Sequence, residues 1–306
     1  MGKERTSFRL REPNLADKLL YQKIMKQANW EYPMGKLIAH GGMSSVYELK
    51  TPEGTPKQVV KVIDTRMIKP DLRHIVREHG LDECNVMGEL ARRSCFIMPL
   101  YGSVWSEIPD TNRKNKSWQE NERIYLLQMP RARNLWTVAV SGMPEREIIQ
   151  LGMDICSALQ ACYSVDRIHR DVKPDNIYVR KGKERRCYIL GDFGIARVVD
   201  NRTLTGVGTE QYLAPELCSG WISRNSDIYS LGVTMFVLAG GTFGPGDTSG
   251  ELAWGNRLDW QTFKEKTHIS TELQRILRKA LQNHGTRYRQ PSDMYEELWW
   301  LHQRTK

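Results

Sequence analysis

Residues 168–177 of the 306-residue chain read Ile-His-Arg-Asp-Val-Lys-Pro-Asp-Asn-Ile, and this segment decides the fold assignment. Six of its ten residues are charged or polar, although it lies between an apolar helical pattern and an apolar β-type run over 177–179. Such a composition is implausible for a core segment and richer in polar groups than a connecting loop requires. We therefore treat the segment as a candidate site.

A second polar motif, Asp-Phe-Gly at 192–194, follows sixteen residues after Asn176, just past a β-type run over 188–190. Asp171, Asn176 and Asp192 are therefore expected to converge where short strands begin or end. Their carboxylate and amide oxygens form a set suited to magnesium and phosphate.

Two further signals lie upstream. Gly41 and Gly42 separate two β-type runs, and such a pair is by default a hairpin turn, although glycine also lets a backbone approach phosphate closely. Lys61 is a single charge inside the apolar run 59–63, and a buried ammonium needs an anionic partner. Glu83 on a predicted helix is the best candidate partner, ahead of Glu78 and Glu89. The alternative is an edge-strand lysine that faces water.

Residues 208–216, Gly-Thr-Glu-Gln-Tyr-Leu-Ala-Pro-Glu, complete an ordered set of motifs. Together with Lys61, the loop 169–176 and the 192–194 motif, they resemble the signature set of the protein kinase superfamily. The resemblance covers roughly residues 33–300. The sequences of residues 41–47 and of Arg287-Tyr288 are most similar to those of bacterial, eukaryotic-like serine/threonine kinases.

The resemblance implies an α+β, bilobal protein kinase fold. We expect an N-terminal extension over 1–32 and a kinase domain over 33–302, with an N-lobe at 33–129 and a C-lobe at 131–302. Periodicity predicts a short helix within the first thirty residues, a helix over 75–91 and a helix around 148–159. It predicts helices for most of the chain after Asp227, with Ser226-Asp227 as the N-cap of the first. The expected strands are 35–39, 46–49, 58–63, 97–101, 124–128, 177–179 and 188–190, with a hairpin loop over 103–121.

By the same resemblance, the chain transfers the γ-phosphate of ATP to serine or threonine hydroxyls of protein substrates. Asp171 would accept or orient the hydroxyl proton, and Asn176 and Asp192 would hold Mg²⁺, or alternatively Mn²⁺. Lys61, paired with Glu83, would bind the α and β phosphates.

Lys173 would contact the γ phosphate, and its place in Asp-Val-Lys-Pro-Asp-Asn is the serine/threonine form of the loop. Thr209 supports that specificity. Further nucleotide contacts are expected from Ile38, Ala39, Gly41, Gly42, Ser44, Val46 and Met129.

Other roles carried by the resemblance are regulatory and structural. Arg170 would bind a phosphate on the activation segment, with Thr203 and Thr205 as the candidate autophosphorylation sites, which implies transient pairing of two copies. Glu216 is expected to pair with Arg287, with Arg289 as the alternative. Asp227 is expected to hold the backbone of the catalytic loop.

The glycine loop departs from the family pattern, because Ala39 and Ser44 replace the first and third glycines. Pro130 at the expected hinge also removes a backbone donor that adenine could use. These departures keep two other functions open: a pseudokinase that binds nucleotide as a scaffold, and a small-molecule phosphotransferase of the same fold.

Composition limits the remaining possibilities. The net charge of +9 is spread evenly, +5 over residues 1–130 and +4 over 131–306, unlike a nucleic-acid-binding tail. Six cysteines without a paired spacing favour free thiols inside the cell. No signal peptide is evident, and the longest apolar run, 231–241, is too short to span a bilayer. We expect no nucleic acid, no membrane contact within this chain and a cytoplasmic location; a membrane segment beyond residue 306 stays open.

Overall fold

The structure is a computed structural model of the whole chain. Its description covers residues 12–41, 44–52, 57–108, 121–137, 143–182, 184–193, 210–218, 221, 223–243, 258–266 and 268–305.

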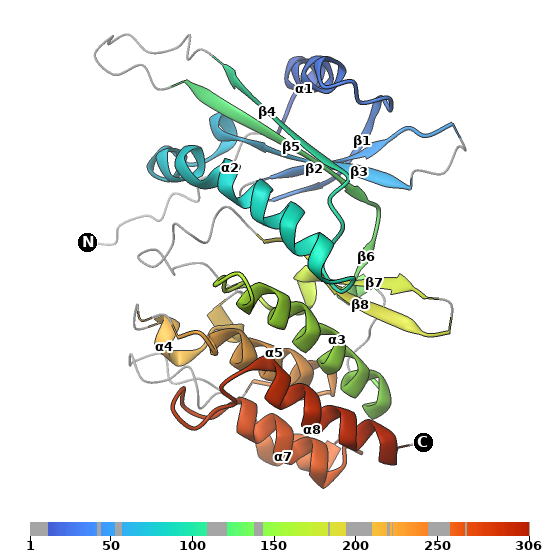
Figure 1. Ribbon diagram of the computed structural model, residues 1–306, viewed down its shortest axis with the longest axis vertical. Coiled ribbons are helices and arrows are strands. Elements are labelled where there is room, and N and C mark those ends of the chain that lie inside the picture. The colour runs from blue at the N-terminus through green and yellow to red at the C-terminus, as the bar shows by residue number, and fades with distance from the viewer. Residues whose placement is uncertain are drawn as a thin grey trace, which may run out of the picture. The chain divides into compact units, whose positions relative to one another are not determined.

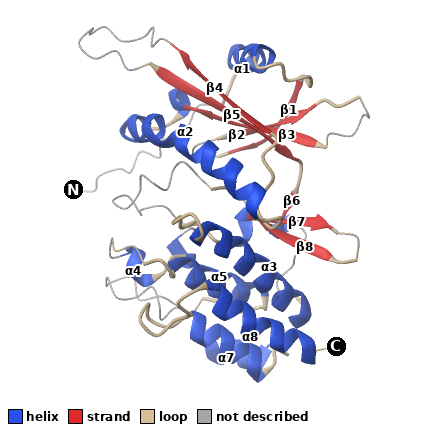
Figure 2. Ribbon diagram, viewed as in Figure 1, coloured by secondary structure: helices blue, strands red, loops and turns tan. Residues whose placement is uncertain are grey.

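The chain divides into two compact units, each described here by itself. Among the described residues, the first unit comprises 12–89 and 99–131, and the second comprises 90–98, 132–193 and 210–305. Strands dominate the first unit and helices the second (Figure 2).

The first unit is built around one antiparallel sheet of five strands in the order β1-β2-β3-β5-β4. The predicted helices at its start and middle both form, and α2 belongs to this unit as far as Glu89. Its elements are α1 (Leu15–Gln27), β1 (Met34–His40), β2 (Ser45–Leu49), β3 (Gln58–Asp64), the 3-10 turn η1 (Thr65–Met67), α2 (Pro70–Arg93), β4 (Gly102–Ile108) and β5 (Glu122–Pro130).

The two helices cover opposite faces of this sheet (Figure 1). Val60 and Val62 of β3 share a buried cluster with the α1 side chains of Tyr21, Ile24 and Met25. On the other face, Gly80 of α2 lies so close to Tyr125 that an added Cβ would be 2.5 Å from the ring. Because side chains alternate along a strand, the odd-numbered residues of β3 face α2.

α1 begins with a complete capping box. The Asn14 side chain accepts the backbone N–H of Asp17, and the Asp17 carboxylate accepts that of Asn14. The helix buries Tyr21, Ile24 and Met25, whereas Leu15 and Leu19 are 72% and 60% exposed. The predicted helix is confirmed, but its first two leucines point away from the core.

One predicted strand is wrong. Residues 97–101 form no strand in the structure, and Ile97 makes only an isolated bridge to Leu190. β4 instead occupies 102–108, so its residues 103–108 fall in the segment predicted as a loop, and it pairs in register with β5. Alternate β4 side chains are exposed, because the strand is at the edge of the sheet, so its composition is more polar than that of a buried strand.

The second unit combines a three-stranded antiparallel sheet, β6-β7-β8, with a bundle of helices. The strands predicted at 177–179 and 188–190 both form. The elements are β6 (Arg133–Asn134), the 3-10 turn η2 (Leu135–Thr137), α3 (Glu145–Tyr163), the 3-10 turn η3 (Pro174–Asn176), β7 (Ile177–Lys181), β8 (Arg186–Leu190), the 3-10 turn η5 (Glu210–Tyr212), α4 (Pro215–Cys218), α5 (Ser226–Leu238), α6 (Trp260–Lys266), α7 (Thr271–Ala280) and α8 (Pro291–Arg304).

α5 is the central helix of this unit, since nearly all of its side chains are buried. Gly152 of α3 permits close packing of three helices: a Cβ there would lie 2.7 Å from Leu298 of α8 and 2.8 Å from Met235 of α5. The N-cap prediction for α5 is wrong by one residue. Asn225 is the N-cap and Ser226 is the first helical residue, because the Ser226 and Asp227 side chains bind other partners.

Among the residues that the structure describes, no helix is both long and apolar enough to cross a bilayer.

Candidate active site

The candidate catalytic loop lies in the second unit, between the end of α3 at Tyr163 and the start of β7 at Ile177. Two apolar side chains anchor it, since Val172 within the loop and Ile177 at its end are fully buried. The polar residues are therefore carried by a backbone that is fixed in its middle and at its end.

Asp227 holds the backbone of this loop. It is fully buried, and its two carboxylate oxygens accept the backbone N–H groups of His169 and Arg170, both at 2.7 Å. Arg170 has a φ of 64°, in the left-handed region, which turns successive amides toward one anion. Burial raises the pKa of Asp227, while these two hydrogen bonds and the charge of Arg170 oppose the rise.

His169 connects the loop to the segment that carries Asp192. The backbone N–H of Asp171 donates to His169 Nδ1 at 3.2 Å, so the ring proton is assigned to Nε2. Nε2 then donates to the Gly191 carbonyl at 3.1 Å. The ring also packs edge-on against Phe193, with centroids 4.6 Å apart. A neutral histidine thus contacts both motifs and links them.

Three predicted site residues meet within the loop. Lys173 Nζ lies 3.2 Å from Asp171 Oδ2, and both side chains are largely buried. Asn176 Nδ2 donates to the Asp171 carbonyl at 2.9 Å. Because the amide nitrogen of Asn176 is used in this way, its Oδ1 is the atom that suits a cation.

Asp192 follows β8 directly and is brought to the loop by its neighbour. The Gly191 backbone N–H donates to the Asn176 carbonyl at 2.9 Å, which joins the two segments that carry the predicted metal ligands. Asp192 has a φ of 58°, a conformation that aspartate tolerates better than most residues.

An amide and a carboxylate fit Mg²⁺, which typically takes one or two protein ligands and completes its shell with water and phosphate. A metal site built from protein side chains alone would need more ligands. In the described part of the chain, no group of three His, Cys, Asp or Glu side chains could hold a metal ion in that way.

Glu216 and Arg287 form a buried, bidentate ion pair. Arg287 Nη1 lies 2.7 Å from Glu216 Oε1, and Nη2 donates to Oε2 at 3.2 Å. The arginine side chain is fully buried and also donates to the carbonyls of Gln282 and Asn225, while Ser226 donates to Glu216. Burial by itself would raise the pKa of Glu216, but the hydrogen bonds and charge of Arg287 hold it below its ordinary value.

In the first unit, Lys61 lies on a central strand. β3 runs between β2 and β5, and Lys61 pairs with Val46 on one side and Leu127 on the other. This position excludes the alternative of an edge-strand lysine. Lys61 is half-buried and belongs to the odd-numbered residues of β3, which face α2.

Glu83 lies on α2, so the structure brings its helix to the face of the sheet that carries Lys61. The side chain of Glu83 is not among those described, and the Lys61–Glu83 pairing stays a prediction.

The predicted glycine loop joins β1 to β2. Ala39 pairs with Val46, and the Gly41 N–H donates to the Ser44 carbonyl at 3.0 Å. Ile38 also lies on β1, and Gly42 is outside the described residues. An added Cβ at Gly41 would meet nothing within 4 Å, so packing alone does not require glycine there.

At the expected hinge, β5 continues through Met129 to Pro130. The Arg131 N–H donates to the Lys57 carbonyl at 2.8 Å, and its guanidinium pairs with Glu48 at 2.7 Å. Met129 lies opposite Val59 of β3, and its contact with adenine stays a prediction.

Three residues with predicted roles, Thr203, Thr205 and Thr209, lie outside the described residues. Sequence reasoning also missed two contributors to the site: His169 as the link to Gly191, and Asn225, whose side chain donates to the carbonyls of His284 and Tyr288. A signal for His169 was present in its motif, whereas nothing local marked Asn225, because its partners lie about sixty residues away.

Comparison with known proteins agrees with this geometry. The family model described as "protein kinase domain" matches residues 32–299, nearly nine-tenths of the chain. The chain therefore belongs to the protein kinase family, which confirms the resemblance found in the sequence. The sheet-rich first unit and the helical second unit confirm the expected α+β fold class.

Individual relatives are distant. CBL-interacting protein kinase 10 of Oryza sativa subsp. japonica is 25% identical over 277 residues, covering 88% of this chain and 56% of the relative. Serine/threonine-protein kinase PknK of Mycobacterium tuberculosis is 28% identical over 273 residues, covering 85% of this chain and 23% of the relative. The chain thus spans about half the length of the first and a quarter of the second.

Among solved structures, Rad53 in complex with AMP-PNP has a TM-score of 0.64 at 19% identity, covering 89% of this chain and 66% of that chain. At this identity, the likeness speaks for the fold alone.

Proposed function

We propose that this protein is a serine/threonine protein kinase that transfers the γ-phosphate of ATP to protein hydroxyls. The observation that carries the proposal is the catalytic loop, in which Asp171, Lys173 and Asn176 are linked to one another and buried Asp227 holds the backbone just before Asp171. Membership of the protein kinase family and serine/threonine kinases among the relatives support it.

In the proposed reaction, the substrate hydroxyl oxygen attacks the γ-phosphorus, and the bond from that phosphorus to the β–γ bridging oxygen breaks. The products are a phosphate ester and ADP. Asp171 orients the hydroxyl and accepts its proton as the new bond forms. Such a loose transition state needs positioning and charge neutralisation more than covalent chemistry.

Lys173 is suited to the γ-phosphate because its ammonium already lies 3.2 Å from Asp171, where donor and acceptor of the phosphoryl group must meet. Lys61, with Glu83, would hold the α and β phosphates. Asn176 Oδ1 and Asp192 would hold Mg²⁺ which, when bound, neutralises phosphate charge.

Autophosphorylation is the regulatory part of the proposal. Arg170 would receive a phosphate carried by Thr203 or Thr205, since a guanidinium binds phosphate with two parallel hydrogen bonds. Mass mapping after incubation with ATP and Mg²⁺ should find phosphate between residues 192 and 216. An active enzyme without phosphate in that interval contradicts this part alone.

The test of the main proposal is transfer of labelled phosphate from ATP to a generic basic protein with Mg²⁺. Asp171→Asn should lower the rate about 10²- to 10⁴-fold, the usual range for loss of a general base. Asp166→Asn is the matched control, because this nearby side chain is 89% exposed and pairs only with Arg224 at the surface in the described contacts. Its transfer should equal that of the wild type.

The same assay separates the two other functions. A nucleotide-binding scaffold would give no transfer with any metal tested, and a small-molecule phosphotransferase would label a metabolite but not the protein. Equal rates for wild type and Asp171→Asn would also overturn the proposal.

A further inference from the structure

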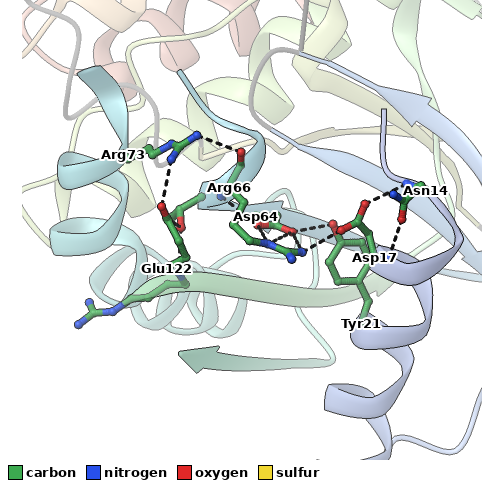
Figure 3. A network of polar contacts seen from close by, with 9 residues as sticks. Asn14, Asp17, Tyr21, Asp64, Arg66, Arg73 and Glu122 are labelled. Atoms are coloured by element: carbon green, nitrogen blue, oxygen red, sulfur yellow. Dashed lines mark hydrogen bonds and ion pairs between the residues drawn. The ribbon is translucent and has the colours of Figure 1, made fainter. Parts of the chain in front are cut away.

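The segment before the kinase domain is bound to the sheet through a polar network at the end of β3 (Figure 3). At this point the chain leaves the sheet and reaches α2 through the turn Thr65–Met67. Asp64, the last residue of β3, is even-numbered and faces α1, whereas α2 packs on the opposite face. The turn therefore carries the chain around the end of the sheet, from the α1 face to the α2 face.

Arg66 in this turn joins β3 to α1. Its Nη2 lies 2.6 Å from Asp64 Oδ2 and 3.1 Å from Asp17 Oδ1, and its Nε donates to Asp64 at 3.0 Å. Tyr21 of α1 donates its hydroxyl to Asp64 at 2.8 Å. Two carboxylates that are almost fully buried thus share one guanidinium, which fixes the direction of the turn.

A third carboxylate, that of Glu122 on β5, binds the other end of the turn. The Thr65 hydroxyl donates to Glu122 at 2.5 Å, and Arg73 Nη1 donates to it at 3.1 Å. Arg73 belongs to the first turn of α2, and its remaining donors go to the carbonyls of Ile68 and Arg66. The Arg66 cluster and the first turn of α2 are therefore parts of one network.

The network has a direct relation to the proposed site. Lys61 lies three residues before Asp64 on the same strand, on the face against which α2 packs. Glu83 lies on that helix, about three turns beyond Arg73. A tilt or shift at the start of α2 changes the separation between these two residues, because a helix moves as a rigid element over this length.

We propose that Arg66 is a positioning residue: braced by Asp17 of α1 and Asp64 of β3, it sets the place of α2 and thereby of Glu83 relative to Lys61. The helix preceding the kinase domain is then an integral part of the phosphate-binding machinery. This inference rests on the proposed function and deepens it.

The test is a double-mutant cycle on the intact chain between Arg66→Met and Glu83→Gln, with kcat and KM for ATP as readouts. Arg66→Met keeps the apolar stem and removes the charge. It should lower kcat/KM about tenfold to hundredfold, the effect expected of an error of about 1 Å in a catalytic arrangement. In the Glu83→Gln background, the same change should have little further effect, because both act through one pairing.

Arg66→Lys should restore only part of the activity, since an ammonium cannot reach two carboxylates in the fork geometry of a guanidinium. Arg275→Met is the control. This arginine also pairs with a carboxylate, that of Glu297 at 2.7 Å, but in the second unit and with 61% of its side chain exposed. Its kinetic constants should match those of the wild type.

A purely structural role for Arg66 would lower kcat only in proportion to the folded fraction, with KM unchanged and with independent effects in the cycle. That result would overturn the inference while leaving the proposed function intact. Absence of transfer in both the wild type and Arg275→Met would overturn the proposed function and, with it, the role assigned here.

If Arg66→Met does not fold, Asp17→Asn takes its place in the cycle. This change removes one of the two carboxylate charges that Arg66 contacts and keeps the Arg66–Asp64 ion pair. Hydrogen exchange gives a readout independent of activity. Amides of residues 70–89 should exchange faster in the variant than in the wild type, and unchanged protection there would count against the positioning role.

Discussion

Each unit holds an arginine against buried carboxylates, but the charges balance differently. In the second unit, Arg287 is fully buried and meets one carboxylate, Glu216, with one positive and one negative charge. In the first unit, Arg66 is 30% exposed and meets two carboxylates, Asp17 and Asp64, which leaves one negative charge uncompensated by this guanidinium.

This difference in charge balance and burial suggests different roles for the two arginines. For a balanced, fully buried ion pair, no other arrangement of the two side chains has a similar energy. The Arg287–Glu216 pair therefore holds α4 and the segment before α8 in one relative position. A partly exposed arginine shared by two carboxylates loses less when one partner is removed, because water can screen what remains. The first arrangement suits a structural contact inside the helical unit, and the second suits the positioning role proposed for Arg66 at the start of α2.

The largest expected effect is on the balanced pair. Arg287→Ala should lower the free energy of unfolding by about 3 to 5 kcal/mol, because it leaves Glu216 buried without its cation. Urea unfolding followed by circular dichroism measures this. Arg275→Ala, at an exposed pair, should cost less than about 1 kcal/mol. Equal costs for the two variants would remove the distinction between the buried and the exposed pair.

The second prediction concerns Tyr21 and Tyr288, a matched pair of buried tyrosines that each donate to a carboxylate. Tyr21→Phe should cost about 1.5 to 3 kcal/mol, since the Asp64 carboxylate is almost fully buried and would keep donors from Arg66 alone. Tyr288→Phe should cost about 1 kcal/mol, because Glu297 keeps Lys279 and Arg275 and is partly exposed. Thermal unfolding measures the loss of stability in each variant. A larger loss for Tyr288→Phe than for Tyr21→Phe would contradict the proposed difference between the two carboxylate environments.

The smallest effect is a dependence on pH. The pKa of Glu216 in the folded state lies below its ordinary value of 4.5, so its contribution to stability is complete above pH 4.5 and is lost as the pH falls through the folded pKa. The stability difference between wild type and Glu216→Gln should therefore be constant from pH 7 to about 5 and shrink below pH 4.5. A difference that grows on acidification would contradict the direction of this pKa shift.

Local sequence patterns were sufficient to predict those elements and motifs that depend only on residues close together in the chain. The apolar stripe of α3, the strands at 177–179 and 188–190 and the family motifs were all readable, because each depends on neighbours in the sequence. The contacts of Asp227 with the loop and of Glu216 with Arg287 were expected only through the family resemblance, since their partners lie 57 to 71 residues away.

The failures have a common cause. Residues 97–101 are as apolar as a strand, yet Ile97 and Met98 are buried against β8 of the second unit and the strand forms at 102–108 instead. Leu15 and Leu19 have helical spacing but are exposed, because Tyr21, Ile24 and Met25 provide the face that meets the sheet. In the first case hydrophobicity predicted burial but not the type of element, and in the second it predicted burial where no tertiary partner covers the side chains.

The sequence by itself determined the family, the order of the elements and the side chains proposed for phosphoryl transfer, because motif identity and periodicity are local properties. Only the tertiary structure decided that Lys61 lies on a central strand and that the helix before the kinase domain is bound through Arg66 to the start of α2. Asp17 and Arg66 are 49 residues apart, and no local pattern records a contact that forms only when a sheet brings two distant segments to the same edge.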